Sequence, residues 1–234
     1  MIEYRITHTT TYQYSVPVRV CHNLLLLSPR ISDRLQCLTH RITIRPTPEM
    51  VTERTDFFGN PIRAFSIEES HRQLVVTAAS HVIVDAPPLS LETESPGWES
   101  VVASIERRTD PRWLEAAPFR YDSRRIRRSG EFAKYARVSF PRNRPILEGA
   151  HDLTRRIHAD FRYDTTATTV DTTPETAFRL RKGVCQDFAQ IQIACLRSLG
   201  IASRYVSGYL RTIPAPGKPR LIGADQSHAW LSVF

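Results

Sequence analysis

Two residues in the last third of the sequence have the types that nucleophilic chemistry needs, Cys185 and His228. Gly183 permits a tight backbone turn just before Cys185, and the apolar pattern that follows predicts a buried helix from Cys185 to Leu199. The first turn of a helix carries free backbone N–H groups and a partial positive charge, and both favour a thiolate. The same N–H groups could hold an oxyanion formed by attack on a carbonyl. The position of Cys185 therefore suits a nucleophile.

A nucleophilic cysteine usually needs a base beside it, and His228 is the best candidate. His228 opens an alternating segment that predicts a strand, with His228 and Trp230 on one face and Ala229 and Leu231 on the other. If this strand belongs to a sheet that packs on the helix of Cys185, thiol and imidazole can meet. We expect a separation of about 3–4 Å or slightly more, since such pairs are often loose before substrate binds.

The remaining cysteines, Cys21, Cys37 and Cys195, read as small apolar side chains that pack in strands or in the helix. The sequence contains no C-x-x-C pair, and reduced thiols are expected. A metal site built on Cys185 and His228 is disfavoured because no third and fourth ligand accompany them. We therefore expect neither a metal nor a cofactor.

Two aspartates lie close to these residues in the sequence. Asp187, in the first turn of the predicted helix, suits a capping role. A carboxylate aimed at Cys185 would oppose thiolate formation, so we assign Asp187 no catalytic role. Asp225 stands three residues before His228 along an extended segment and is expected to point elsewhere rather than to orient the imidazole.

The chain divides into three regions that together predict an α+β fold. Residues 1–85 have the short alternating strands of a β-sandwich-like domain, and residues 86–144 resemble a connector with short helices at 98–108 and 129–137. Residues 145–234 form a core in which helices alternate with strands. The elements predicted there are helices at 146–160, 174–180 and 185–199 and two strands, at 204–212 and 228–234.

Composition sets limits on location and partners. The 234 residues carry a net charge of +8. The dense run Arg124–Arg128 is interpreted as a solvated face or exposed linker rather than as a nucleic-acid site, because aromatic residues do not interleave it. No apolar run is long enough for a transmembrane helix, and no secretory signal is visible at the N-terminus, so we expect a cytoplasmic protein without a membrane partner. The oligomeric state is left open.

Three segments together resemble the bacterial transglutaminase-like family. They are Gly183–Ala189 (GVCQDFA), Leu196–Tyr209 and Gly223–Trp230, the last containing the S-H-A-W tetrapeptide. The segment Tyr4–Tyr14 resembles the β-rich N-terminal region often attached to such domains. The resemblance implies a papain-like core, in which a helix packs on an antiparallel sheet, with a Cys-His-Asp triad. It also implies that Cys185 is the nucleophile and His228 the base.

The activity implied by the resemblance is cysteine-dependent hydrolysis of an amide or isopeptide bond, or acyl transfer to an amine, through a thioester on Cys185 of a peptide or protein substrate. The family's third residue, an Asp, follows the His on a later strand, whereas this sequence ends at Phe234. We therefore expect an abbreviated form with impaired catalysis, and a binding module of the same fold remains the alternative. An arginine-driven nucleic-acid binder is a more distant one.

Overall fold

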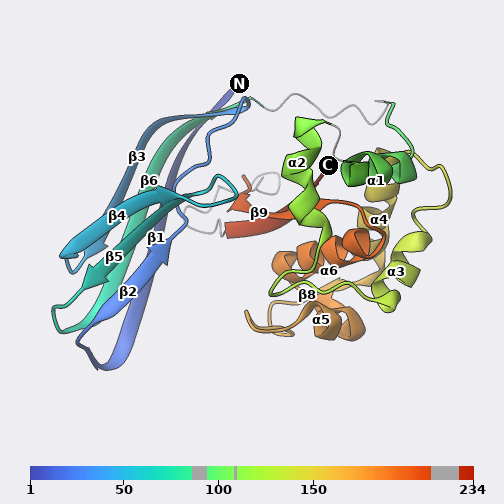
Figure 1. The fold of residues 1–234 in the computed structure, drawn as a ribbon. Coiled ribbons are helices and arrows are strands. Elements are labelled where there is room, and N and C mark those ends of the chain that lie inside the picture. Colours follow the sequence, from blue (N-terminus) through green and yellow to red (C-terminus); the bar gives the residue numbers. More distant parts are fainter. Residues whose placement is uncertain (86–93, 108–109, 212–226) are drawn as a thin grey trace, which may run out of the picture. The chain divides into compact units, whose positions relative to one another are not determined.

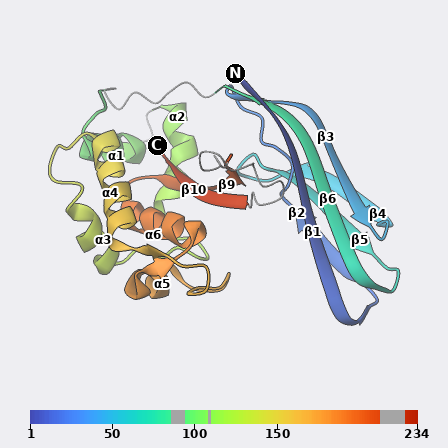
Figure 2. The same cartoon turned by 180° about the vertical axis from the view of Figure 1, so that it is seen from behind.

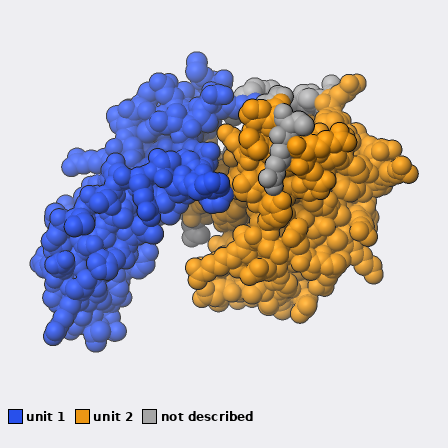
Figure 3. Space-filling model, viewed as in Figure 1, with its two compact units in different colours: residues 1–89 blue, residues 90–234 orange. Residues whose placement is uncertain are grey.

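A computed structural model describes residues 1–85, 94–107, 110–211 and 227–234. The chain forms two compact units, residues 1–89 and residues 90–234 (Figure 3). Each has a hydrophobic core of its own.

The first unit is built from two antiparallel three-stranded sheets, with strand orders β1-β6-β3 and β2-β5-β4 (Figure 1). The β-branched residues that favour extended structure are frequent in its long strands. Its core joins β3, β5 and β6 through Ile44, Phe65, Ile67, Leu74 and Val76. The two sheets therefore form a sandwich around one apolar layer. The strands are β1 (Ile2–Val18), β2 (Cys21–Leu25), β3 (Leu35–Arg45), β4 (Met50–Thr55), β5 (Pro61–Ile67) and β6 (His71–Val84).

The second unit surrounds one long buried helix, α6 (Figure 2). Helices α3, α4 and α5 contact α6, as do the paired strands β9 and β10. The helices are α1 (Trp98–Arg107), α2 (Pro111–Ala116), η1 (Ala117–Arg120), α3 (Gly130–Arg137), α4 (Ile146–Asp160), α5 (Pro174–Leu180) and α6 (Cys185–Ser198). The strands are β7 (Arg162–Tyr163), β8 (Lys182–Gly183), β9 (Ser203–Tyr209) and β10 (Ser227–Val233).

The segment that we expected to be a connector contributes to the core of the second unit. Val101 and Ile105 of α1 and Phe132 of α3 are buried in the same cluster as the residues of α6. Short helices of this kind gain little stability alone, so burial of their apolar faces against α6 accounts for their folding. The compact unit accordingly begins near residue 90, ahead of the position 145 at which we expected the core to start.

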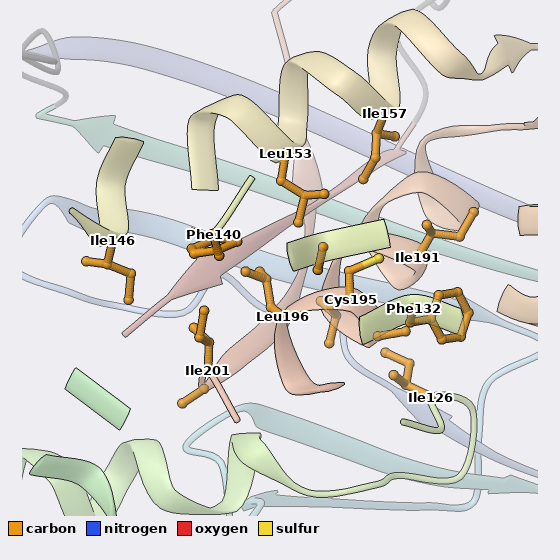
Figure 4. Packing of buried hydrophobic residues seen from close by; sticks show 14 of the residues in the cluster. Ile126, Phe132, Phe140, Ile146, Leu153, Ile157, Ile191, Cys195, Leu196 and Ile201 are labelled. Atoms are coloured by element: carbon orange, nitrogen blue, oxygen red, sulfur yellow. The ribbon is translucent and has the colours of Figure 1, made fainter. Parts of the chain in front are cut away.

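The core of the second unit lies between α4 and α6. Leu153 and Ile157 of α4 lie over Cys195 and Leu196 of α6 (Figure 4). Gly200 ends α6 in the left-handed conformation, with a φ of 82°. The N–H groups of Gly200 and Ile201 donate to the carbonyls of Arg197 and Leu196, which makes a Schellman motif. Tertiary packing and a strong stop signal thus fix both the position and the length of the helix.

The antiparallel sandwich and the helix packed on an antiparallel sheet confirm the predicted α+β class. The predicted helices 146–160 and 174–180 are found with those bounds, and the helix predicted from Cys185 starts at that residue. The predicted strand 204–212 ends at Tyr209, and Thr212 lies outside the described residues. In the described part of the chain, no helix has the length and apolar character needed to cross a membrane.

Gly149 of α4 gives a test of this core. A Cβ atom at Gly149 would lie 2.4 Å from Cε1 of Phe140, whereas a Cβ at Gly130 of α3 would meet nothing within 4 Å. Alanine is the better helix former by roughly 1 kcal/mol, yet overpacking costs about 1–3 kcal/mol. We expect Gly149→Ala to lower the free energy of unfolding in urea and Gly130→Ala to leave it unchanged or raised. Equal effects of the two substitutions would contradict the packing.

Candidate active site

The first turn of α6 is held by Asp187. Its carboxylate is 2% exposed and accepts hydrogen bonds from the backbone N–H of Val184 at 2.8 Å and from Oγ1 of Thr168 at 2.7 Å. A Cβ at Gly183 would lie 2.5 Å from Oδ2 of Asp187, so only glycine lets the carboxylate fold back over the turn. These contacts confirm the predicted capping role of Asp187. They fix the backbone that carries Cys185.

The threonine-rich loop after β7 packs on this turn. Asp164 accepts hydrogen bonds from the N–H and hydroxyl of Thr166, which lower the pKa of its carboxyl below the usual value. The backbone N–H of Asp164 donates to the carbonyl of Gly183 at 2.9 Å, where β7 and β8 pair in parallel. The loop then delivers Thr168 to Asp187. Thr168 is a positioning residue that sequence reasoning missed, because its contact joins two residues nineteen positions apart in the sequence.

Arg181 anchors the segment just before Gly183. Its backbone adopts a left-handed conformation, with a φ of 54°, where α5 ends. Its guanidinium carbon lies 4.3 Å from the ring centroid of Phe178, 4.6 Å from that of Phe161 and 5.2 Å from that of Tyr135. Packing a cation on aromatic faces is favourable. The stack therefore ties the approach to Cys185 to helices α3 and α5.

His228 lies half-buried on β10, in register with Gly208 of β9. A Cβ at Gly208 would meet Cη2 of Trp230 at 2.7 Å, so this glycine makes room for the indole ring. The S-H-A-W segment thus starts the second strand of a hairpin whose first strand follows directly from α6. Asp225 lies outside the described residues, so its predicted lack of a role stays a prediction.

Cys185 and His228 are carried by elements that contact each other, α6 and β10. Leu231 and Val233 are the side chains of β10 that pack into the core. Because side chains alternate along a strand, His228 lies on the other face of the hairpin from Leu231. Among the described residues, no hydrogen bond joins the thiol of Cys185 to the imidazole of His228. Their pairing as nucleophile and base stays a prediction.

Tyr205 of β9 lies within electrostatic reach of Cys185. Partial burial raises the pKa of the Tyr205 hydroxyl, and the negative charges of Cys185 and Asp187 raise it further. Tyr205 therefore remains a protonated hydrogen-bond donor at neutral pH. Sequence reasoning did not single out this tyrosine, because only the packing of β9 on α6 brings it near the thiol.

Arg197 joins three parts of the second unit from the far end of α6. This arginine is 6% exposed, and its Nη2 donates to the carbonyl of Ser203 at 2.8 Å. Its Nη1 donates to the carbonyl of Tyr121 at 3.0 Å and to Oγ of Ser123 at 3.4 Å. Burial lowers the pKa of the guanidinium, and the three acceptors compensate for its desolvation. One side chain thus fixes β9 and the loop after η1 to the helix of Cys185.

The other cysteines occupy different environments. Cys195 is fully buried, and burial raises the pKa of its thiol to about 12. Cys21 lies in the first unit, with its sulfur 3.7 Å from Nε2 of His71, and Cys37 is half-buried in β3. Within the described ranges, no cluster of three or more His, Cys, Asp or Glu side chains is arranged to hold a metal ion.

Two family models match the chain. The bacterial transglutaminase-like N-terminal region matches residues 4–83, and the transglutaminase-like superfamily matches residues 135–234. An uncharacterized protein of Mycobacterium tuberculosis is 41% identical over 234 residues, which cover 99% of this chain and 73% of that protein. One from Mycobacterium leprae is 27% identical, over 98% of this chain and 78% of that protein. The chain belongs to the transglutaminase-like superfamily.

A solved structure agrees with this fold. The crystal structure of a proposed cysteine protease from Cytophaga hutchinsonii matches with a TM-score of 0.77 at 20% identity. The match covers 99% of this chain and 72% of the other. At this identity the likeness concerns the arrangement of the chain, and it confirms the predicted class of fold.

The cap on α6 can be tested by substitution. Asp187→Ala removes the acceptor for the Val184 N–H and the Thr168 hydroxyl, and losing such a cap costs about 1–2 kcal/mol of unfolding free energy. Thr168→Val should cost about 1 kcal/mol, because it removes one of the two hydrogen bonds. Denaturant titration measures both losses, with Glu115→Ala at an exposed position as the control. An Asp187→Ala protein as stable as the parent would overturn this account.

The environments of the cysteines predict an order of thiol reactivity. Iodoacetamide at neutral pH should modify Cys185 first, because this half-buried residue stands at a helix N-terminus. Cys195 should react only on unfolding, since burial shields its thiol and disfavours the thiolate. Peptide mapping by mass spectrometry over time gives each rate. Faster labelling of Cys21, Cys37 or Cys195 than of Cys185 would count against the assignment.

Proposed function

We propose that this protein is a cysteine-dependent enzyme that cleaves an amide or isopeptide bond of a peptide or protein through a thioester on Cys185. The observation that carries the proposal is the position of Cys185 at the capped start of α6, next to the hairpin that bears His228. The family match and the likeness to a proposed cysteine protease support it. We include a cytoplasmic location in this proposal.

The proposed reaction begins when the Cys185 sulfur, as its proton passes to His228, attacks the carbonyl carbon of the amide. The backbone N–H groups of the first helical turn have no carbonyl partner within α6, so they are available to stabilise an oxyanion. His228 takes the thiol proton and gives it to the departing amine as the C–N bond breaks. Water or a second amine, deprotonated by His228, then attacks the thioester and regenerates the thiol. The proposed reaction balances in atoms and protons without a cofactor.

The proposed dyad requires the imidazole to reach the thiol in the substrate complex. Strand alternation places His228 on the face of β10 opposite Leu231, so the proposal requires the imidazole to turn toward the thiol when substrate binds. Catalytic hydrogen bonds are often long or misaligned before that point. If Cys185 proves unreactive, the alternative of a catalytically impaired binding module with this fold takes its place. The experiment below separates the two.

The test is turnover of a mixture of peptides, with the product masses compared with and without an added primary amine. A mass gain of water on cleavage shows hydrolysis, and incorporation of the amine shows transfer. Cys185→Ala should abolish turnover, and His228→Asn should lower it by about 100-fold or more, the usual range for loss of a general base. Cys37→Ala is the matched control. Full turnover by the Cys185→Ala protein would refute the mechanism.

A further inference from the structure

A pocket of about 380 Å³ lies near Cys185 between four segments, namely the loop from Tyr121 to Arg128, the threonine-rich loop at Val170, the first two turns of α6, and β9. Ile126 and Val170 give it an apolar part. The polar part consists of Ser123, Arg125, Gln186, Gln190 and Tyr205. Gln186 directly follows Cys185 in the first turn of α6, and Tyr205, which also lines the pocket, lies within electrostatic reach of Cys185. We refer to this site as the Arg125 pocket. Its volume is within the range of ordinary ligand sites.

Gln190 gives the pocket an amide group that a ligand can bind. Only 6% of this residue is exposed, and its carboxamide makes no hydrogen bond to any described residue. Because its polar atoms are not among the fully enclosed side-chain atoms without a partner, the carboxamide is accessible from the pocket that it lines. A ligand with peptide-like donors and acceptors would supply the missing hydrogen bonds.

Arg125 gives the pocket its charge. Its guanidinium donates to the carbonyl of Val170 and lies 3.7 Å from Asp171. Asp171 is 89% exposed, so water and salt weaken this ion pair. A guanidinium has five N–H donors, which leaves others for a ligand. The phenol of Tyr205, which keeps its proton at neutral pH, adds a neutral donor to the lining.

The acidic groups near the pocket are otherwise engaged. The Asp187 carboxylate accepts hydrogen bonds from the Val184 N–H and the Thr168 hydroxyl. The Asp122 carboxylate accepts hydrogen bonds from the backbone N–H and the guanidinium of Arg128. A carboxylate in the pocket would therefore meet donors and one cation, with Asp171 at the exposed rim as its main competitor. Arg197 keeps Ser123 and the start of β9 at a fixed spacing, so the walls are formed before a ligand binds.

We propose that the Arg125 pocket binds an acidic side chain of the peptide substrate, next to the amide that Cys185 attacks. This inference rests on the proposed function, because it takes the peptide bound in the pocket to be the substrate whose amide Cys185 attacks. It also assigns a role to one residue of the Arg124–Arg128 run, which we had interpreted as a solvated face. Charge-assisted hydrogen bonds from Arg125 to the carboxylate would select glutamate over glutamine.

The experiment measures the binding of fluorescein-labelled, end-blocked pentapeptides, Gly-Ala-X-Ala-Gly with X as Glu, Gln or Lys, to the full Cys185→Ala chain by anisotropy. We expect the Glu peptide to bind about tenfold more tightly than the Gln peptide and the Lys peptide to bind most weakly. Arg125→Gln should reduce the Glu preference, measured as the ratio of the Kd of the Gln peptide to that of the Glu peptide, to about one. Arg127→Gln, which removes the same charge from an exposed position outside the pocket, should retain it. Gln190→Leu should weaken Glu and Gln peptides alike.

Equal binding of the Glu and Gln peptides, no measurable binding of any peptide, or equal losses in the two arginine variants would reject the pocket proposal. Failure of the enzyme proposal would instead be seen in the turnover and thiol-labelling experiments, because binding to the Cys185→Ala chain does not depend on thiol chemistry. A Glu preference beside an unreactive Cys185 would leave an acidic-peptide binding site without catalysis. A reactive Cys185 without a Glu preference would remove the pocket proposal alone.

Discussion

The burial of the central turns of α6 is the constraint on which the second unit depends. Ile191, Ile193, Ala194, Cys195 and Leu196 have no exposed surface, and helices and strands contact the helix around its circumference. A helix surrounded in this way cannot shift along its axis without breaking many contacts, because protein interiors are close-packed. Its first residue therefore has a fixed position, and that residue is Cys185.

Each end of α6 also contributes to the site. At the start, Gly183 leaves room for Asp187 to bond Val184 and Thr168, so the backbone turn before the thiol is closed by hydrogen bonds. At the far end, Arg197 reaches β9 and the loop after η1, the two elements that face the first turns of the helix across the pocket. The positions of the nucleophile and of the pocket walls beside it are thus both set by α6.

Local signals in the sequence were sufficient to predict helices α4, α5 and α6 of the second unit. Pro174 after Thr173 marks the start of α5, and Gly200 marks the end of α6, because capping depends on residues a few positions apart. The role of the short helices α1 and α3 was not predictable in this way, since their apolar residues pack in a core formed with residues distant in the sequence. The same holds for Thr168, Gln190 and Tyr205. Their importance arises from tertiary neighbours, which composition and periodicity do not encode.

The aromatic setting of Arg181 has a consequence for behaviour in salt. Ions in solution screen the exposed pairs nearby, such as Arg179 with Glu131 at 3.8 Å and Lys182 with Asp164 at 3.9 Å. They have little access to a guanidinium packed on the rings of Phe178 and Phe161. Raised ionic strength should therefore loosen the charged periphery of α5 and leave the turn into Gly183 in place. The backbone turn that carries the thiol should therefore be halotolerant, whereas the exposed ion pairs around it should weaken in salt.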